Sequence, residues 1–135
     1  MNYWLIKQEP SKYSFDDLIA EGKTDWTGVR NFQARNNLRA MRAGDRILFY
    51  HSLSEKSVVG VAEVAGDAFQ DATDKTGKWI AVKIKPIEKF MKAVTLEEVR
   101  TEKNLQNIAL IKQSRLSVMP LTPEEFTTIL KLSGN

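Results

Sequence analysis

The middle of the chain contains three strand-like segments in succession, with no helical pattern between them. They are residues 46–51 (RILFYH), 58–64 (VVGVAEV) and 79–85 (WIAVKIK). The polar residues 52–57 between the first two are typical of a hairpin turn. The third segment alternates in polarity, which predicts one buried and one solvated face. Because a doubly wound parallel sheet needs a helix between successive strands, we expect an α+β domain built on a mixed or barrel-like sheet.

Helix-start signals flank this central region on both sides. A hydroxyl or amide residue precedes each predicted helix, and in three of the four an acid follows three residues later as a capping box. Strands are predicted at residues 3–7 and 116–121, so the order is strand, helix, helix, three strands, helix, strand, helix. The predicted helices run from Ser14 to about Gly22, from Asn31 to about Met41, from Thr95 to about Glu102, and from Thr122 onwards.

Composition limits the chemistry that is available to the chain. Its 135 residues are 42% hydrophobic and 27% charged, which suits a single folded domain spanning residues 1–135. There is no cysteine and one histidine, which excludes thiol redox chemistry and structural zinc fingers. We expect no metal and no cofactor. The net charge of +3 permits an anionic partner.

No run of apolar residues approaches the ~18 that span a bilayer, and the start of the chain lacks the pattern of a signal peptide. We therefore expect no membrane association and an intracellular, cytoplasmic location, or a nuclear one in a eukaryotic cell.

Three segments place polar and aromatic residues at the margins of regular elements, where binding sites are usually built. They are residues 24–36, 49–52 and 112–117. In the first, Trp26 is predicted to lie in a loop close to arginine and amide residues. A flat ring in that setting suits a planar ligand. The ligand stacks on the ring, and the amide groups form hydrogen bonds with its polar edge. The alternative, of similar weight, is that Trp26 anchors the core at one end of the domain.

Catalytic interpretations of the sequence are weaker. His51 and Ser52 are adjacent on a strand, so their side chains point to opposite faces, and no glycine elbow surrounds them. We expect His51 to be a hydrogen-bonded edge residue and Ser52 to end its strand with a hydroxyl facing a pocket. The paired acids of the chain all fall in first helical turns, where they favour the helix dipole. Gly60, inside a strand, indicates a bulge or a close approach of ligand to backbone.

The second predicted helix carries an apolar face and, beside it, a basic one. Both recur at i, i+4 and i+7, one residue apart around the helix. A basic stripe alone is usually a solvated surface, and it favours an anionic ligand only beside Trp26. The apolar positions are Ala34, Leu38 and Met41, and the basic ones are Arg35, Arg39 and Arg42.

Five blocks of sequence, in order and almost from end to end, resemble the signature of the EVE domain family. The most specific is WTGVRNFQARN at residues 26–36. It departs from the family pattern at Phe32, where tyrosine is common, and Gln8 stands where serine is common. The other blocks are YWLIKQEP (3–10), GD (44–45), FYHS (49–52) and SRLSV (114–118).

The resemblance implies a PUA-like fold related to YTH domains: an open pseudo-barrel of mixed strands with helices packed around it. It also implies a pocket for a modified base, with modified cytosine in DNA as the first candidate and a modified RNA base as the second. Trp26 matches the first tryptophan of the YTH aromatic cage, and Phe69 is the candidate for a second wall. The implied pocket consists of Trp26, Val29, Asn31, Ser52, Phe69, Ser114 and Leu116, and the implied polar or phosphate contacts are Lys7, Arg30, Gln33, Arg35, Arg39 and Arg115.

The resemblance predicts recognition without catalysis, with nucleic acid as the partner. Proteins of restriction, repair or RNA processing are further possible partners. Two alternatives remain open: a small hydrolase or nuclease of the PUA-like group, which needs a general base, and a protein-interaction adaptor, which needs a broad exposed apolar patch.

Overall fold

The N-terminal strand lies inside a mixed sheet. The structure is a computed structural model that describes residues 1–135. β1 pairs in parallel with β3 and antiparallel with β7, and the full order is β2-β6-β4-β3-β1-β7, with β5 paired to β6 outside this path. The expected mixed α+β sheet is confirmed. The strands are β1 (Tyr3–Gln8), β2 (Thr24–Trp26), β3 (Arg46–His51), β4 (Ser57–Val64), β5 (Phe69–Gln70), β6 (Ile80–Thr95) and β7 (Val118–Leu121).

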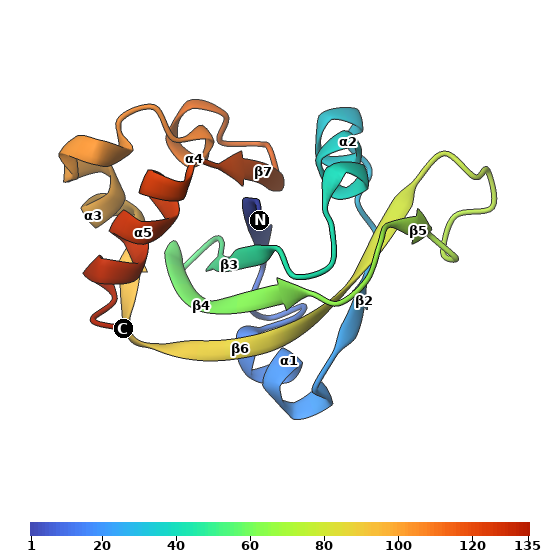
Figure 1. Cartoon of the computed structure of the whole chain (residues 1–135), viewed down its shortest axis with the longest axis horizontal. Helices are drawn as coiled ribbons and strands as arrows, with labels where there is room; N and C mark the ends of the chain where they lie inside the picture. The colour runs from blue at the N-terminus through green and yellow to red at the C-terminus, as the bar shows by residue number, and fades with distance from the viewer.

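The helices surround this sheet, which curls into an open half-barrel (Figure 1). Helices α3, α4 and α5 gather at one end, α2 lies on the side of β7 and β6, and α1 lies against β6. None of the helices has the length and apolar character needed to cross a membrane. They are α1 (Phe15–Glu21), α2 (Phe32–Ala40), α3 (Leu96–Thr101), the 3-10 helix η1 (Lys103–Leu105), α4 (Ala109–Lys112) and α5 (Pro123–Leu132).

The predicted helix starts are confirmed in detail. Ser14, Thr95 and Thr122 each form a complete capping box, in which the hydroxyl accepts from the third helical N–H and the acid accepts from the cap N–H. The side chain of Asn31 accepts from the backbone N–H of Ala34 and caps α2. These local hydrogen bonds need no tertiary contact, which explains why the sequence pattern predicts them correctly.

The predictions miss elements that depend on long-range pairing. β2 and β5 are only three and two residues long and exist because both pair with β6. β6 does not end at Lys85 as predicted but continues to Thr95, because β4 pairs with it along this length. Pro86 is tolerated because β2 pairs only with residues 82–84, which leaves β6 a free edge further along.

The core runs through all layers as one cluster of 33 buried residues. Its polar anchor is Asp45, which is 3% exposed. The carboxylate accepts hydrogen bonds from the indole of Trp4 and from the backbone N–H groups of Asn2 and Arg42. The start of β1 is thereby tied to the turn between α2 and β3.

Gly60 marks a bulge, as predicted, but the group that approaches its backbone belongs to the protein. The register of β4 against β6 shifts between Val58 and Gly60. A Cβ atom at Gly60 would lie 2.6 Å from the Phe15 ring. That ring is 1% exposed and meets Phe49 edge-on, so it has no room to move. Glycine is needed here for packing, not for a ligand.

We expect Gly60→Ala to lower the free energy of unfolding by about 1–3 kcal/mol, because the added methyl overpacks the contact with Phe15. Gly66→Ala is the matched control, since a Cβ there meets nothing within 4 Å. Urea unfolding monitored by tryptophan fluorescence measures both. Equal stability of the two variants would contradict the packing role of Gly60.

Candidate functional site

The three segments singled out in the sequence meet at the C-terminal end of β1. The backbone N–H of Ser52 donates to the carbonyl of Gln8 at 2.9 Å, so the end of β3 lies beside the end of β1. On the other side, the N–H of Lys7 donates to the carbonyl of Ser117 at 2.9 Å, and its Nζ donates to the carbonyl of Ser114 at 2.6 Å. Strand pairing therefore brings together residues that are more than 100 positions apart.

Three hollows surround this meeting point. The first, which we call the tryptophan recess, has a volume of about 210 Å³ and the second, the amide recess, about 360 Å³. The third, the cationic cavity, is described below. Gln8, Tyr13, Thr24, Asp25, Trp26 and Thr27 line the tryptophan recess, and Asn31, Gln33, Lys112, Gln113, Ser114, Arg115 and Leu116 line the amide recess.

Trp26 does not lie in a loop, and that prediction was wrong. It ends β2 opposite Val82 of β6 and is 6% exposed. Its ring meets Phe49 and Tyr13 edge-on, with centroids 5.4 Å and 5.9 Å away. Trp26 is thus a core residue with one margin in the tryptophan recess, which combines the two interpretations left open by the sequence.

The structure does not bring Phe69 to the tryptophan recess, which overturns its expected place as a second wall. Phe69 pairs with Ala81 on β6, whereas Trp26 pairs with the next residue, Val82. Neighbouring residues of a strand point to opposite faces. The side chains of Phe69 and Trp26 are therefore on opposite sides of β6.

Of the other predicted pocket residues, all but Val29 line at least one of the hollows. Val29 and Leu116 are buried, at 7% and 4% exposure, and Leu116 lines the amide recess. The side-chain oxygen of Asn31 accepts the capping hydrogen bond of α2, while its amide nitrogen donates to no protein group. Ser52 follows the last residue of β3, as predicted, and lines the third hollow. Ser114 lines both this hollow and the amide recess.

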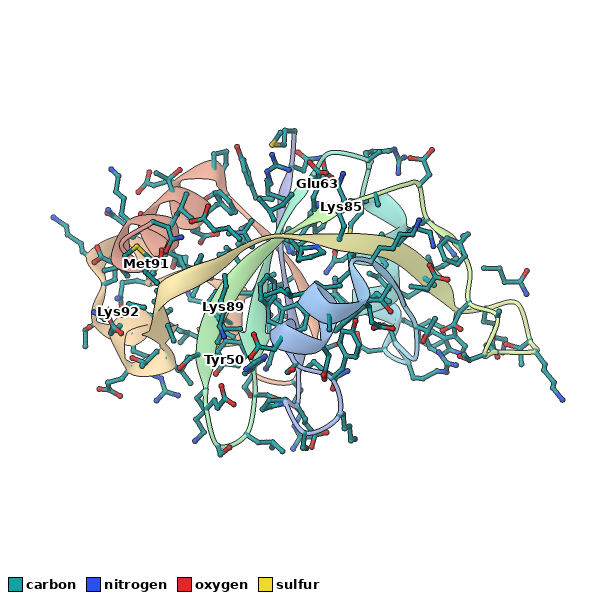
Figure 2. All side chains as sticks on the ribbon, turned by 90° about the horizontal axis from the view of Figure 1, so that it is seen from below. Tyr50, Glu63, Lys85, Lys89, Met91 and Lys92 are labelled. Atoms are coloured by element: carbon teal, nitrogen blue, oxygen red, sulfur yellow. The ribbon has the colours of Figure 1, made fainter.

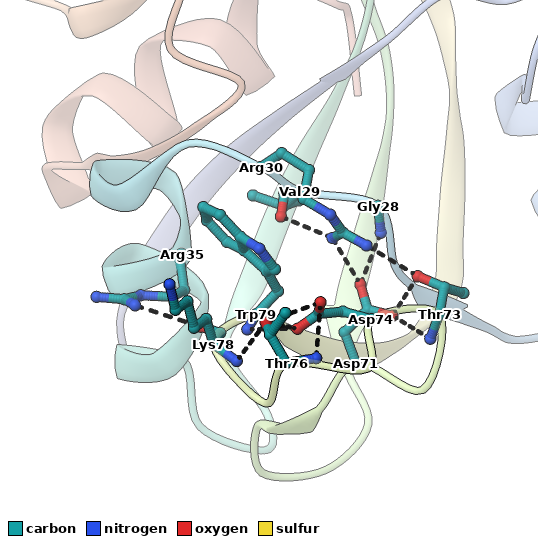
Figure 3. Close-up of polar contacts among 10 residues, drawn as sticks. All are labelled: Gly28, Val29, Arg30, Arg35, Asp71, Thr73, Asp74, Thr76, Lys78 and Trp79. Carbon is teal, nitrogen blue, oxygen red and sulfur yellow. Dashed lines mark hydrogen bonds and ion pairs between the residues drawn. The ribbon is translucent and has the colours of Figure 1, made fainter.

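The arginines differ in how their charge is used. Arg30 is bound to Asp71 at 3.1 Å and to the hydroxyl of Thr73 at 3.1 Å, so its charge is already neutralised (Figure 3). Arg35 donates to the side chain of Asn36 and the carbonyl of Lys78 and has no acidic partner. Arg39 and Arg115 are exposed and make no ion pair.

An aromatic pair beside these arginines was missed in the sequence. Phe32 is 58% exposed and stacks on Trp79, with centroids 5.0 Å apart and planes at 26°. The guanidinium of Arg35 lies 4.9 Å from the Phe32 ring, and that of Arg30 lies 5.6 Å from the Trp79 ring. The sequence pattern placed Trp79 only at the start of a strand and gave it no partner, so only the fold reveals this stack, in which Phe32 is exposed and Trp79 is half-buried.

The loop that carries Trp79 is held by Asp71, which is fully buried. Its carboxylate accepts from Gly28, Arg30 and Thr73, which joins the loop before α2 to the loop before β6 (Figure 3). Burial by itself would raise the pKa of Asp71. The hydrogen bonds from Thr73, Gly28 and Arg30 outweigh it and lower the pKa to about 2.

His51 is engaged at both ring nitrogens. Nε2 accepts from the backbone N–H of Phe15 at 3.0 Å, and Nδ1 lies 2.9 Å from Glu55. The expected hydrogen bonding is confirmed, although β3 is an inner strand and His51 is not at a sheet edge. No three His, Asp or Glu side chains converge as metal ligands.

The curled mixed sheet with helices around it defines the PUA-like class of fold. An ASCH protein from Zymomonas mobilis shares it at a TM-score of 0.60 and 13% identity, over 98% of this chain and 99% of that one. The model of the EVE domain matches residues 2–132. The chain belongs to the EVE domain family.

Relatives match almost the whole chain, and some of them have known structures. A protein from Rhodopseudomonas palustris has 45% identity and a TM-score of 0.94, over 99% of this chain and 94% of that one. Human THYN1, solved in complex with 5-methylcytosine containing DNA, has 32% identity and a TM-score of 0.93, over 100% and 99%. Mouse thymocyte nuclear protein 1 is 35% identical over 97% of this chain and 73% of its own length.

Asp71 makes the stability of the protein sensitive to acid. Because the folded-state pKa is about 2 and the ordinary value is 3.8, its contribution is present above pH 3.8 and is lost as the pH falls towards 2. We expect the melting temperature to fall over this range. We expect Asp71→Asn to have a lower melting temperature at pH 7, and a melting temperature that falls less steeply as the pH is lowered (a flatter acid limb). Calorimetry from pH 7 to pH 2 measures this. A variant that keeps the steep acid limb of the parent would contradict the assignment to Asp71.

Proposed function

We propose that this protein is a nucleic-acid-binding module that recognises a modified base, 5-methylcytosine in DNA in the first instance, and that it performs no catalysis. The observation that carries the proposal is the group of recesses at the end of β1, which amide groups, hydroxyls and uncompensated cations surround. The complex of the human relative with 5-methylcytosine containing DNA supports the choice of base and of nucleic acid. The proposal treats residues 1–135 as one domain, since one core cluster runs through it.

In this proposal a base leaves its stack and enters the molecule at the end of β1, where the tryptophan and amide recesses lie. Trp26 supplies the apolar wall of the tryptophan recess and Leu116 that of the amide recess, while Val29 packs in the core. The free amide nitrogen of Asn31 and the hydroxyl of Ser114 read the polar edge of the base, and Gln33 provides a further amide at the rim. Ser52, first expected in the same pocket, lines only the cationic cavity and takes no part in reading this base.

Full stacking on an aromatic ring supplies about 1–3 kcal/mol whatever the base is, and the single margin of Trp26 is expected to supply no more than the lower end of this range. A buried methyl adds ~0.8 kcal/mol, or about fourfold in affinity, so selectivity for the methyl is expected to be modest.

The flanking strand is held by cations in this proposal. Arg35, Arg39 and Arg115 have no acidic partner and are free to contact phosphates, together with Lys7. Arg30 has a different role from the one first expected, because its ion pair with Asp71 positions the loop at residues 27–31. The exposed stack of Phe32 on Trp79 offers a second surface for a neighbouring base.

Two observations disfavour the alternatives. A hydrolase needs a general base, and the only histidine is 7% exposed with both nitrogens engaged. An adaptor needs one broad apolar patch. The exposed large hydrophobic residues are instead spread over the N-terminus, α1, α2, the β3–β4 turn, β5 and β6.

Replacing Asn31 by Ser separates binding from folding. Serine caps a helix about as well as asparagine, so α2 is kept while the amide donor is lost. We expect about tenfold weaker binding to a 5-methylcytosine oligonucleotide, as for loss of a base-edge contact, with an unchanged melting temperature. Fluorescence anisotropy with single-stranded and duplex DNA containing cytosine or 5-methylcytosine, and with N6-methyladenine RNA, measures this and identifies the preferred strand.

Asn104→Ser makes the same change of side chain on η1, outside the recesses, and serves as the control. Unchanged binding in Asn31→Ser would remove Asn31 from the base pocket. If the parent protein binds no oligonucleotide above a background that salt abolishes, the proposed function itself fails.

Arg115→Gln tests the phosphate contacts. Because each phosphate contact releases counterions, we expect the slope of log K against log salt to become shallower by about 0.7–0.9. The loss of affinity should be the same for methylated and unmethylated oligonucleotides, since phosphates carry no base information. Anisotropy titrations at several salt concentrations measure the slope. A change in methyl selectivity with an unchanged slope would place Arg115 on the base instead.

A further inference from the structure

The third hollow, the cationic cavity, lies between the end of β1, the β3–β4 turn, α3 and α4. Its volume is about 280 Å³. It touches the amide recess at one residue only, Ser114. Its lining consists of Lys7, Tyr50, Ser52, Leu53, Lys56, Leu96, Arg100, Leu110, Ile111 and Ser114.

Three cations and no acid line this cavity. Lys7, Lys56 and Arg100 take part in none of the ion pairs of the protein. Lys7 is half-buried, and burial lowers its pKa because no carboxylate compensates the charge. Like charges gathered in a partly apolar hollow repel one another, and a bound anion relieves this.

The hydroxyl of Tyr50 is an unused donor at the same place. Tyr50 is 3% exposed, yet its hydroxyl makes no hydrogen bond within the protein. No fully buried side-chain oxygen or nitrogen lacks a partner, so this hydroxyl must reach solvent, and the cationic cavity is the one hollow that Tyr50 lines. Its ring lies 5.8 Å from Nζ of Lys7. Burial raises the pKa of Tyr50, and the nearby charge of Arg100 opposes this rise. The donor therefore opens into the cavity beside the cations.

Apart from the hydroxyl residues Ser52 and Ser114, the rest of the lining is apolar. The apolar lining consists of Leu96 on α3, Leu110 and Ile111 on α4, and Leu53, which is 60% exposed, in the β3–β4 turn. The backbone of the turn is left-handed at Leu53, with φ 64°, and at Lys56, with φ 44°. At non-glycine residues this conformation is costly and is found where the surroundings enforce it, often at ligand clamps. The cavity thus offers a cationic part and an apolar part, and its volume is many times that of one water molecule.

We propose that the cationic cavity binds a nucleotide unit. Its phosphate would contact Lys7, Lys56, Arg100 and the hydroxyl of Tyr50, and its sugar or base would pack against the apolar lining residues. The phosphate has two possible sources. One is the strand whose modified base occupies the neighbouring recess, a source that rests on the proposed function. The other is a free mononucleotide, which does not depend on it.

The test is a titration of the full chain with deoxycytidine 5′-monophosphate, followed by calorimetry and by NMR shifts of backbone amides. We expect shifts at Leu53, Lys56 and Arg100. Arg100→Gln should weaken binding about tenfold, because a charged hydrogen-bond donor is lost. Tyr50→Phe removes only the hydroxyl and should also weaken binding while the melting temperature stays the same. Deoxycytidine, which lacks the phosphate, should bind more weakly than the monophosphate.

Lys85→Gln is the matched control for the loss of one positive charge. Lys85 pairs with Glu63, which lies opposite Arg46 at the far end of β3 from Tyr50. Figure 2 shows Lys85 and Glu63 together, away from Tyr50. Equal affinity of Arg100→Gln and Lys85→Gln for the monophosphate would overturn the proposal, as would shifts confined to Asn31 and Gln33.

A 5-methylcytosine oligonucleotide distinguishes the two sources. If Arg100→Gln weakens the oligonucleotide and the monophosphate together, the cavity holds the flanking nucleotide of the strand. If only the monophosphate is weakened, the cavity is a separate nucleotide site. Oligonucleotide binding that fails in the parent protein while the monophosphate still binds would refute the proposed function and leave the nucleotide site standing.

Discussion

The pairing of β1 with β3 on one side and β7 on the other is the contact on which the candidate site depends. β1 runs parallel to β3, so both strands end at the same edge of the sheet, and the segment before β7 crosses that edge. The backbone hydrogen bonds from Ser52 to Gln8 and from Lys7 to Ser117 hold the end of β3, β1 and the segment before β7 in register. A slip of one residue would turn every side chain of β1 to the opposite face and would dismantle the recesses.

The polar groups near this edge of the sheet are of two kinds: some are hydrogen-bonded within the protein, and others have no partner of opposite charge. Asp71 and His51 are buried and fully engaged, and they fix the segments around the site, while Asp45 does the same at the opposite end of β1. The cations around the recesses and the cationic cavity, in contrast, have no acidic partners. The paired buried groups hold the site rigid, and the unpaired cations leave positive charge at its surface. Such positive charge favours the binding of an anionic polymer.

Trp26 shows how one residue serves both the fold and the proposed site. Its burial against Phe49 and Tyr13 contributes to the core, and only one margin faces the tryptophan recess. Sequence interpretation treated these roles as alternatives because a tryptophan between polar residues has no periodicity that reveals strand β2. The three residues of β2 form a strand only through pairing with β6, which is a long-range contact.

Local hydrogen bonds and periodicity determined the helix starts, the central hairpin and the buried face of α2, because each depends on residues a few positions apart. The signature motif identified the family for a similar reason, since it is a property of the chain itself. The tertiary structure alone decided that Arg30 neutralises Asp71, that Phe69 and Trp26 lie on opposite faces of β6, and that Tyr50 and Arg100 share a cavity. These relations depend on strand register and on loops that meet across 40 or more residues, and no local pattern encodes such distances.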